Sequence, residues 1–275
     1  MRRTLPRRLA GLMLVAALIG AAGCSREPSA GPPEPFGDFA VGQFGGVAGL
    51  QEILRVRADG NAVLIAREPA SGRFTQEEMG RLRTLLTSEE FRLEVARELE
   101  GKRKPRKVEC SDQIITEVSM GSLSLSRSGP CGKEDLPDAP VFDEILTIVG
   151  PARRGDFAGP VDGSEPRLVP IRLERLATAS RSGYLITIDR RGAGSITTEG
   201  AAARRAEVGP ADRDTLRLLL PPLTSAPITP CQSTEYYRVR IESATPVSAS
   251  DCEFRRSNPE FRALVTVVET AFGVS

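Results

Sequence analysis

The sequence predicts an α+β protein made of two tandem repeats, each an antiparallel sheet with a disulfide-closed hairpin and two helices on one face. Three observations predict this fold. Cys110 and Cys131 have the same spacing as Cys231 and Cys252. A strand, glycine turn and strand pattern occurs before each cysteine pair, and a helical pattern that contains Phe follows each pair. The same order of elements, met twice, indicates an internal duplication.

The chain opens with a segment typical of a secretory signal. Arginines without acids precede an apolar run from Leu9 to Gly23, and small residues end that run. This is the basic, apolar and small-residue order of a signal peptide, and the run is shorter than the ~20 residues that a membrane-spanning helix needs. We therefore expect residues 1–23 to be removed.

The end of this segment, Ala21-Ala22-Gly23-Cys24, resembles the lipobox of bacterial prolipoproteins. That family usually has Leu or another larger aliphatic residue where this sequence has Ala21. The resemblance implies a lipid on Cys24 and a protein exported and anchored to the outer face of the bacterial cytoplasmic membrane or cell envelope. The alternative is plain secretion, in which Cys24 is discarded or left near the cut. Residues 24–37 are rich in Pro and Gly and predict a lipidated tether.

The first repeat is expected over residues 38–150. Leu54 to Ile65 reads as two strands around a turn at Gly60. Thr75 and Glu78 form a capping box that predicts the start of a helix. The stretch from Ser88 to Leu99 predicts a further short helix that the second repeat lacks.

A hairpin and a helix complete the first repeat. Apolar and polar residues alternate on both sides of Met120-Gly121, which predicts half-buried strands with the turn at that point. Such a hairpin places Cys110 opposite Cys131, so a disulfide would close its open end. Asp138 to Val149 has Phe at helical spacing from an aliphatic pair, with Pro near the first turn and Gly150 placed to stop the helix.

Residues 151–166, rich in Gly, Pro and Asp, are the expected linker, and residues 167–275 the second repeat. Its strands turn at Gly192, and its first helix opens at Pro210 and ends at Pro221-Pro222. The hairpin turns near Ser243 to Pro246. The last helix begins near Asn258, and Gly273 is placed to stop it.

The four cysteines beyond Cys24 form an even set in an exported chain, which predicts two disulfides. The equal spacing favours the local pairs, Cys110 with Cys131 and Cys231 with Cys252. A metal site is the rival interpretation. It is disfavoured because no two cysteines lie two to four positions apart, as zinc ligands usually do.

Glycines mark the entry to the first repeat, in Phe44-Gly45-Gly46-Val47-Ala48-Gly49-Leu50. This segment, with the elements after it, resembles the emfourin family of bacterial metalloprotease inhibitors over residues 38–150. In that family a Gly-Gly-Phe-Ala-Gly-Leu signature links the first two strands, and Val47 departs from it. The second repeat lacks the signature, and usual members of the family lack the cysteine pair.

From the residues alone, the glycine cluster predicts a tight strand connection with positive φ. A phosphate loop would need a helix directly after the glycines.

Composition disfavours an enzyme. The chain has no His, which removes the commonest general base and the commonest zinc ligand. We therefore expect no catalytic, cofactor-binding or metal-binding residues. The acid pairs Glu77-Glu78, Glu89-Glu90 and Asp143-Glu144 are expected in first turns of helices, where they complement the helix dipole.

The formal net charge of +1 argues against nucleic acid as a partner. The basic segment from Lys102 to Lys107 is interpreted as a solvated loop, with contact to anionic lipid or an acidic partner as the alternative. We expect a non-enzymatic module that binds an unknown protein partner, with an exported protease as one partner class. The alternative is a structural or assembly component of the cell envelope.

Overall fold

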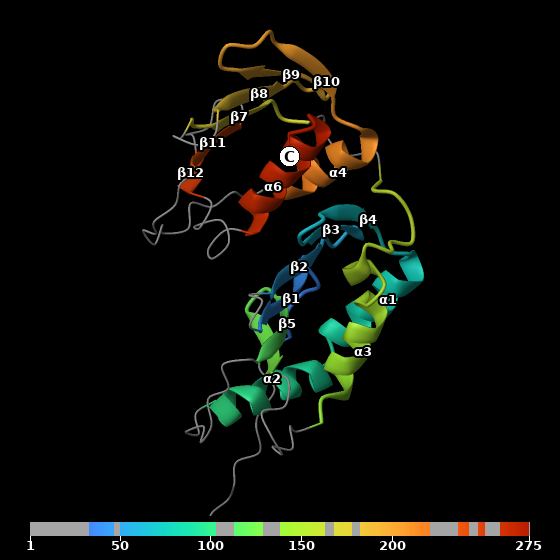
Figure 1. Cartoon of the computed structure of the whole chain (residues 1–275). Coiled ribbons are helices and arrows are strands. Elements are labelled where there is room, and N and C mark those ends of the chain that lie inside the picture. The colour runs from blue at the N-terminus through green and yellow to red at the C-terminus, as the bar shows by residue number, and fades with distance from the viewer. Residues whose placement is uncertain are drawn as a thin grey trace, which may run out of the picture.

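The computed structural model describes residues 33–46, 50–102, 113–128, 138–162, 168–177, 182–220, 236–241, 247–250 and 259–274. Within these residues the protein is α+β, with two antiparallel sheets of six strands and five helices (Figure 1). The predicted fold class is confirmed. Cys24, Cys110, Cys131, Cys231 and Cys252 lie outside the described residues, and so do the predicted signal peptide and both disulfides.

The first sheet, sheet A, has the strand order β4-β3-β2-β1-β5-β6. Helices α1, α2 and α3 cover one of its faces, and a short 3-10 turn, η1, follows α3 (Figure 1). The elements are β1 (Phe39–Gly45), β2 (Leu50–Val56), β3 (Asn61–Ile65), β4 (Ala70–Arg73), α1 (Gln76–Leu86), α2 (Glu89–Lys102), β5 (Ile114–Met120), β6 (Leu123–Ser128), α3 (Pro140–Val149) and η1 (Ala152–Arg154).

The second sheet, sheet B, has the order β10-β9-β8-β7-β11-β12, which repeats that of sheet A strand for strand. Helices α4 and α6 pack on it and correspond in order to α1 and α3. The elements are β7 (Ile171–Arg175), β8 (Tyr184–Ile188), β9 (Ala193–Thr198), β10 (Arg204–Glu207), α4 (Pro210–Leu219), β11 (Tyr236–Ile241), β12 (Val247–Ser250) and α6 (Pro259–Ala271). The predicted duplication is therefore confirmed in the topology.

The duplication extends to individual hydrogen bonds in the second hairpin of each repeat, formed by β2 with β3 and by β8 with β9. Gly60 has φ of 91° and its N–H donates to the carbonyl of Arg57 at 2.9 Å. Gly192 has φ of 87° and donates to the carbonyl of Asp189 at 3.1 Å. Both glycines adopt the left-handed conformation that glycine accepts without steric cost. The two turns therefore fix equivalent positions along the strands of the two sheets.

The first repeat has three helices on its face, one more than predicted for each repeat. The extra helix is α2, predicted over Ser88 to Leu99 and observed over Glu89–Lys102. It lies along the edge strand β6, where the carboxylate of Glu98 accepts from the backbone N–H of Ser126 at 2.8 Å and from its hydroxyl at 2.7 Å. Because an uncovered edge strand can pair with other chains, α2 protects this edge.

The two glycines predicted to stop the last helix of each repeat behave differently. Gly273 follows α6 with φ of 61°, as predicted. Gly150 also follows its helix as predicted, because α3 ends at Val149, but its φ of −54° is right-handed. The chain instead continues through Pro151 into η1, and the left-handed residue is Gly155, with φ of 85°.

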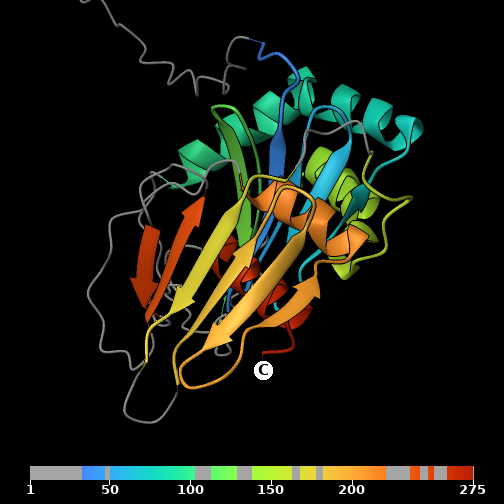
Figure 2. The same ribbon diagram turned by 90° about the horizontal axis from the view of Figure 1, so that it is seen from above.

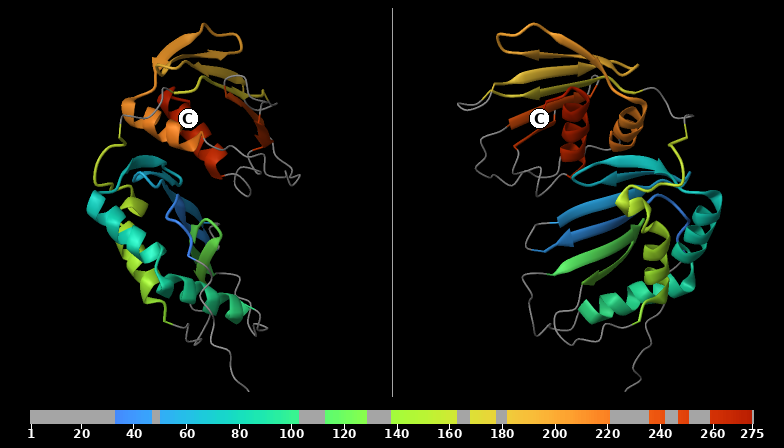
Figure 3. Two further views of the ribbon diagram at one scale, coloured as in Figure 1. Left: turned by 180° about the vertical axis from the view of Figure 1, so that it is seen from behind. Right: turned by 45° about the vertical axis from the view of Figure 1, so that its right-hand side comes forward.

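The molecule is a stack of four layers: α1 to α3, sheet A, α4 with α6, and sheet B (Figures 1 and 3). The strand β3 is buried on both faces. Ala62 and Leu64 join the core under α1 to α3, whereas Val63 and Ile65 join the core that contains α4 and α6. The prediction of helices on one face is therefore incomplete for sheet A. Its second face is covered on the β3 and β4 side by the helices of the second repeat.

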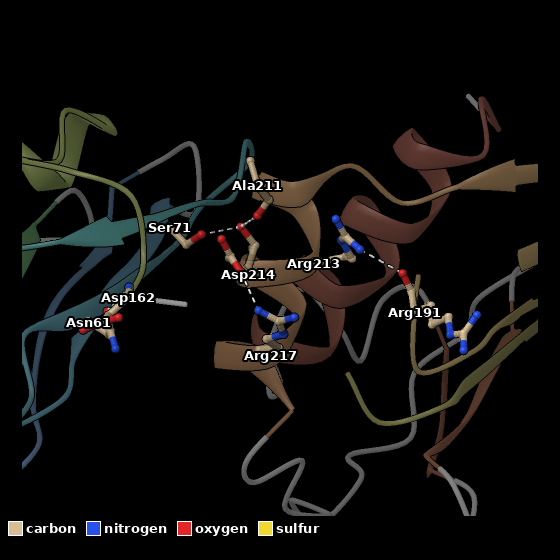
Figure 4. A network of polar contacts seen from close by, with 9 residues as sticks. Asn61, Ser71, Asp162, Arg191, Ala211, Arg213, Asp214 and Arg217 are labelled. Atoms are coloured by element: carbon tan, nitrogen blue, oxygen red, sulfur yellow. Dashed lines mark hydrogen bonds and ion pairs between the residues drawn. The ribbon is translucent and has the colours of Figure 1, made fainter. Parts of the chain in front are cut away.

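Polar contacts tie the two repeats together at this junction (Figure 4). The hydroxyl of Thr215 on α4 bonds to that of Ser71 on β4 at 2.9 Å, and Arg55 pairs with Glu260 on α6. The described part of the predicted linker also packs against sheet A, because the N–H of Arg73 donates to the carbonyl of Gly159 at 2.9 Å. The two repeats are thus joined by contacts of α4 and α6 with sheet A and by the bond between β4 and the linker.

Candidate functional site: an exposed arginine face

The outer face of sheet B is a polar surface that no described element covers. Along β7, Ile171 and Leu173 are buried toward α4 and α6, so the alternating positions Arg172 and Glu174 point outward. No described element lies over this side of the sheet (Figure 2). We call it the arginine face; its outward residues are Arg172, Glu174, Leu185, Thr187, Ser195, Thr197, Arg205, Glu207, Arg238 and Arg240.

Three of these arginines and two hydroxyls form one row across five strands. The register pairs Arg240 with Arg172, Arg172 with Thr187, Thr187 with Ser195, and Ser195 with Arg205. Neighbouring strands lie about 4.8 Å apart, so the row extends over about 19 Å. The hydroxyls of Thr187 and Ser195 are 3.1 Å apart in its middle. The row therefore presents donors at regular intervals across the sheet.

The row carries uncompensated positive charge. Arg172 and Arg240 are directly opposite each other, an arrangement that is unfavourable for like charges. Within the described part of the chain, neither of them nor Arg205 makes an ion pair, whereas Arg238 pairs with Glu174 at 3.5 Å. Such an arrangement is relieved by an anionic partner, because guanidinium groups bind carboxylates through paired hydrogen bonds.

The same row in sheet A has a different chemistry. The registers place Arg172, Arg205 and Arg240 at the positions of Ala40, Ser71 and Ser119. Thr187 and Ser195 correspond to Arg55 and Val63 in the same way. In sheet A the residues on the β3 and β4 side of the row are covered by α4 and α6. At these three positions the second repeat therefore has exposed arginines where the first repeat has small residues.

A hollow of about 720 Å³ adjoins the row at the turn between β8 and β9. Thr187, Ser195 and Arg205 line it together with Arg190 and Arg191 of the turn. The carboxylate of Asp189 in the same turn accepts from the backbone N–H groups of Arg191 and Ala193, at 2.8 and 3.0 Å. The hollow thus combines cationic and hydroxyl donors and can hold anionic groups.

A second hollow, of about 410 Å³, lies between the repeats and is lined by Asp38, Arg55, Arg57, Asn61 and Leu218, among others. Its polar groups already have partners. Asp38 accepts from the N–H of Ala58 at 2.8 Å, Arg55 pairs with Glu260, and Asn61 accepts from the N–H of Asp162 at 2.9 Å. This hollow is therefore part of the junction between the repeats.

The glycine cluster has the structural role that the sequence predicts. Gly45 and Gly46 have φ of 105° and 71° at the connection between β1 and β2, and a Cβ on Gly45 would lie 2.2 Å from the carbonyl oxygen of Gln113. A strand, β2, follows the glycines, as the strand interpretation predicts. Residues 47–49 lie outside the described part of the chain.

The acid pairs lie at helix starts, with one exception. Glu77, Glu78, Glu89, Glu90 and Asp143 are in first turns. Glu144 comes one residue later and pairs with Arg81 at 3.0 Å. The basic segment after Lys102 lies outside the described residues.

Sequence reasoning missed the arginine row, although part of its signal is local. Arg238 and Arg240 alternate with the buried Tyr237 and Val239, which already places them on the outer face of a strand. Their alignment with Arg172 and Arg205 depends on strand register and could not be read from one segment.

Among the described residues, no group of three or more Cys, Asp or Glu side chains is placed to hold a metal ion. The helices in the described ranges are all too short or too polar to cross a membrane.

No protein-family model matches the sequence, and neither a curated protein nor a solved structure matches it. The lipoprotein and emfourin resemblances therefore rest on the residues quoted for them.

Proposed function

We propose that this protein is a non-enzymatic binding module, held at the cell surface by a lipid on Cys24, that binds an acidic protein partner on its arginine face. The observation that carries the proposal is the exchange of Ala40, Ser71 and Ser119 in the first repeat for Arg172, Arg205 and Arg240 in the second. Uncompensated arginines in one row favour an anionic surface and speed its association.

The course of the N-terminal segment supports a partner in solution over a membrane. Phe36 packs against the core under α1 to α3, with the guanidinium of Arg83 5.0 Å from its ring centre. Glu34 accepts from the N–H of Ser122 at 2.9 Å. The described chain thus begins on the first repeat, and sheet A, α4 and α6 separate this point from the arginine face (Figure 1). A lipid on Cys24 would therefore join the folded protein at the first repeat, whereas the arginine face belongs to the second.

The partner interface can be tested with a photo-crosslinking residue at Thr187, in the centre of the row. We expect an adduct with a second protein in intact cells, and no adduct from the same residue at Glu90, which is exposed on α2 in the opposite outer layer. Charge reversal at all three positions, R172E with R205E and R240E, should abolish the adduct. The matched control reverses Arg81, Arg97 and Arg154, which are exposed on the first repeat. Equal adducts from both triple variants would contradict the proposal.

The inhibitor version of the proposal rests on the emfourin resemblance of residues 38–150. The purified mature protein is assayed at micromolar dose against a panel of exported metalloproteases. Inhibition of at least one protease is the expected result. A panel that stays fully active argues against inhibition, and the crosslinked protein then identifies the partner class, including a component of the cell envelope.

A further inference from the structure

A third hollow, of about 670 Å³, opens at the end of sheet B on the face opposite to the arginine face. Arg175, Ser182, Tyr184, Thr198 and Arg204 line it, together with Gly273 and Val274 after α6. The neighbours Arg204 and Arg205 point to opposite faces of β10, because Arg204 pairs in register with the buried Ile196 and Arg205 with the outward Ser195. The hollow is therefore separate from the arginine row.

Both guanidinium groups in this hollow are held in place. Arg175 stacks on the ring of Tyr184, 4.5 Å from its centre, and donates to the carbonyl of Ser182 at 3.2 Å. Its buried Nε has no hydrogen-bond partner. Arg204 donates to the carbonyl of Phe272 just beyond the end of α6. A buried N–H without a partner is unfavourable, so the Nε–H of Arg175 is a donor that an acceptor bound beside this side chain would satisfy.

The platform beneath Arg175 is also fixed. The hydroxyl of Tyr184 donates to Glu269 on α6, and the hydroxyl of Tyr237 lies 3.4 Å from the same carboxylate oxygen. Burial raises the pKa of Tyr184 far above its usual value, and the hydrogen bond to Glu269 raises it further. The phenol therefore stays neutral and keeps its place beneath the guanidinium.

The first repeat shows what fills the equivalent space there. The registers place Arg175 and Arg204 at the positions of Gln43 and Ala70. In the first repeat, η1 enters this region: Arg153 donates to the side-chain oxygen of Gln43 at 2.7 Å, and a Cβ on Gly155 would lie 3.9 Å from that of Ala70. In the first repeat the cation, Arg153, comes from η1 and contacts an uncharged residue of the sheet. In the second repeat the cations Arg175 and Arg204 belong to the sheet itself, so the ligand that complements them is an anion.

We propose that this hollow binds a small ligand with an oxyanion group, a carboxylate or a phosphate, through Arg175 and Arg204. Arg175 of β7 and Arg204 of β10 line one space, and a guanidinium offers donors in a planar fork that matches such groups. The hydroxyls of Ser182 and Thr198 add polar lining. A volume of about 670 Å³ is that of a site for a small molecule.

The test is a titration of the mature protein at constant ionic strength with two probes, citrate and inorganic phosphate. Calorimetry measures affinity, and the ¹⁵N-labelled arginine Nε–H signals report the site. We expect saturable binding of one probe in the millimolar range or tighter, with a shift of the Arg175 Nε–H signal. Citrate alone indicates a carboxylate ligand, and phosphate alone a phosphate. The absence of saturable binding for both probes overturns the proposal.

Variants make the assignment specific. Arg175→Gln and Arg204→Gln should each weaken binding by about tenfold or more, because each removes a charge-assisted hydrogen bond. Arg97→Gln is the matched control: it removes the same charge from an exposed position on α2 of the first repeat, outside both the hollow and the arginine face. If R97Q weakens binding as much as R204Q, the proposal is wrong. If R204Q does not fold, Arg175→Lys takes its place in the test. This variant keeps the positive charge but loses the planar fork, and we expect it to weaken ligand binding by itself. This titration is independent of the crosslinking experiment. If the triple variant R172E, R205E and R240E loses its partner adduct, the binding of small ligands in the hollow is still expected.

Discussion

At the scale of single residues, Glu94 is the clearest case of a charged side chain with a structural task. It is 5 % exposed, and its carboxylate accepts from the backbone N–H groups of Val141 and Phe142 at 3.0 and 3.1 Å. The N-cap residue of α3, Ala139, has no side chain that can cap the helix. Glu94 from α2 replaces it and places negative charge at the positive end of the helix dipole.

Glu94→Ala should lower the free energy of unfolding by about 1–3 kcal/mol, because it leaves two N–H groups at a buried helix start without acceptors. Urea denaturation followed by circular dichroism measures the change. Glu100→Ala, on the same helix and exposed, is the control and should stay within about 0.5 kcal/mol of the parent. Equal destabilisation by both variants would show that Glu94 acts only through the helicity of α2.

The two caps of the first repeat differ in how far a sequence can predict them. Thr75 and Glu78 are three residues apart, and the capping box they predict is present, with the N–H of Glu78 bonded to the Thr75 hydroxyl at 3.1 Å. Glu94 is 47 residues before Val141 in the chain. No local pattern connects them, so only the packing of α2 against α3 reveals the second cap.

At the scale of elements, β3 and β9 are equivalent strands whose residues differ on one face. That face of β3 lies inside the stack, whereas that of β9 lies on the outer surface. Val63 and Ile65 of β3 correspond in register to Ser195 and Thr197 of β9. The first two are buried against the core with α4 and α6, whereas Thr197 is exposed on the arginine face. A strand buried on both faces reads as a continuous apolar run, and one buried on a single face reads as an alternation.

Ile65→Ala should lower the free energy of unfolding by about 2–5 kcal/mol, since it opens a cavity in the junction between the repeats. Thr197→Ala, at the equivalent place in sheet B, should change it by no more than about 0.5 kcal/mol. Urea denaturation of both variants measures the difference. Similar values for the pair would mean that α4 and α6 do not seal the second face of sheet A in solution.

At the scale of the whole molecule, the stack ends differently on its two sides. The helices α1 to α3 close one end, and the polar face of sheet B forms the other (Figures 1 and 3). A repeat that stacks another repeat on its sheet needs an apolar surface there, as Val63 and Ile65 provide in sheet A. The arginines of sheet B therefore suit a polar partner and disfavour a third stacked repeat.

The predicted anchor and disulfides are testable by mass spectrometry of the native, membrane-extracted protein without reduction. We expect a diacylglyceryl-modified Cys24 at the N-terminus and linked peptides that join Cys110 to Cys131 and Cys231 to Cys252. In the chain-entropy account, loops of this length stabilise the fold by about 3 kcal/mol each. An unmodified N-terminus would refute the anchor, and free thiols or links between the repeats would refute the local pairing.

The sequence by itself determined the repeated order of glycine-turn hairpin, helix, second hairpin and helix, the capping box at Thr75 and the glycine turns, because each depends on residues close together in the chain. The short strands β4 and β10 were not among the predicted elements. The alternation of Arg238 and Arg240 with Tyr237 and Val239 is also local, although it did not enter the sequence predictions. Only the tertiary structure decided that α4 and α6 lie between the two sheets, that Arg172 and Arg205 join the same row, and that Arg175 and Arg204 share a hollow. The physical reason is range: turns and caps form between near neighbours, whereas layers and rows depend on strand register and on apolar faces that meet across the whole chain.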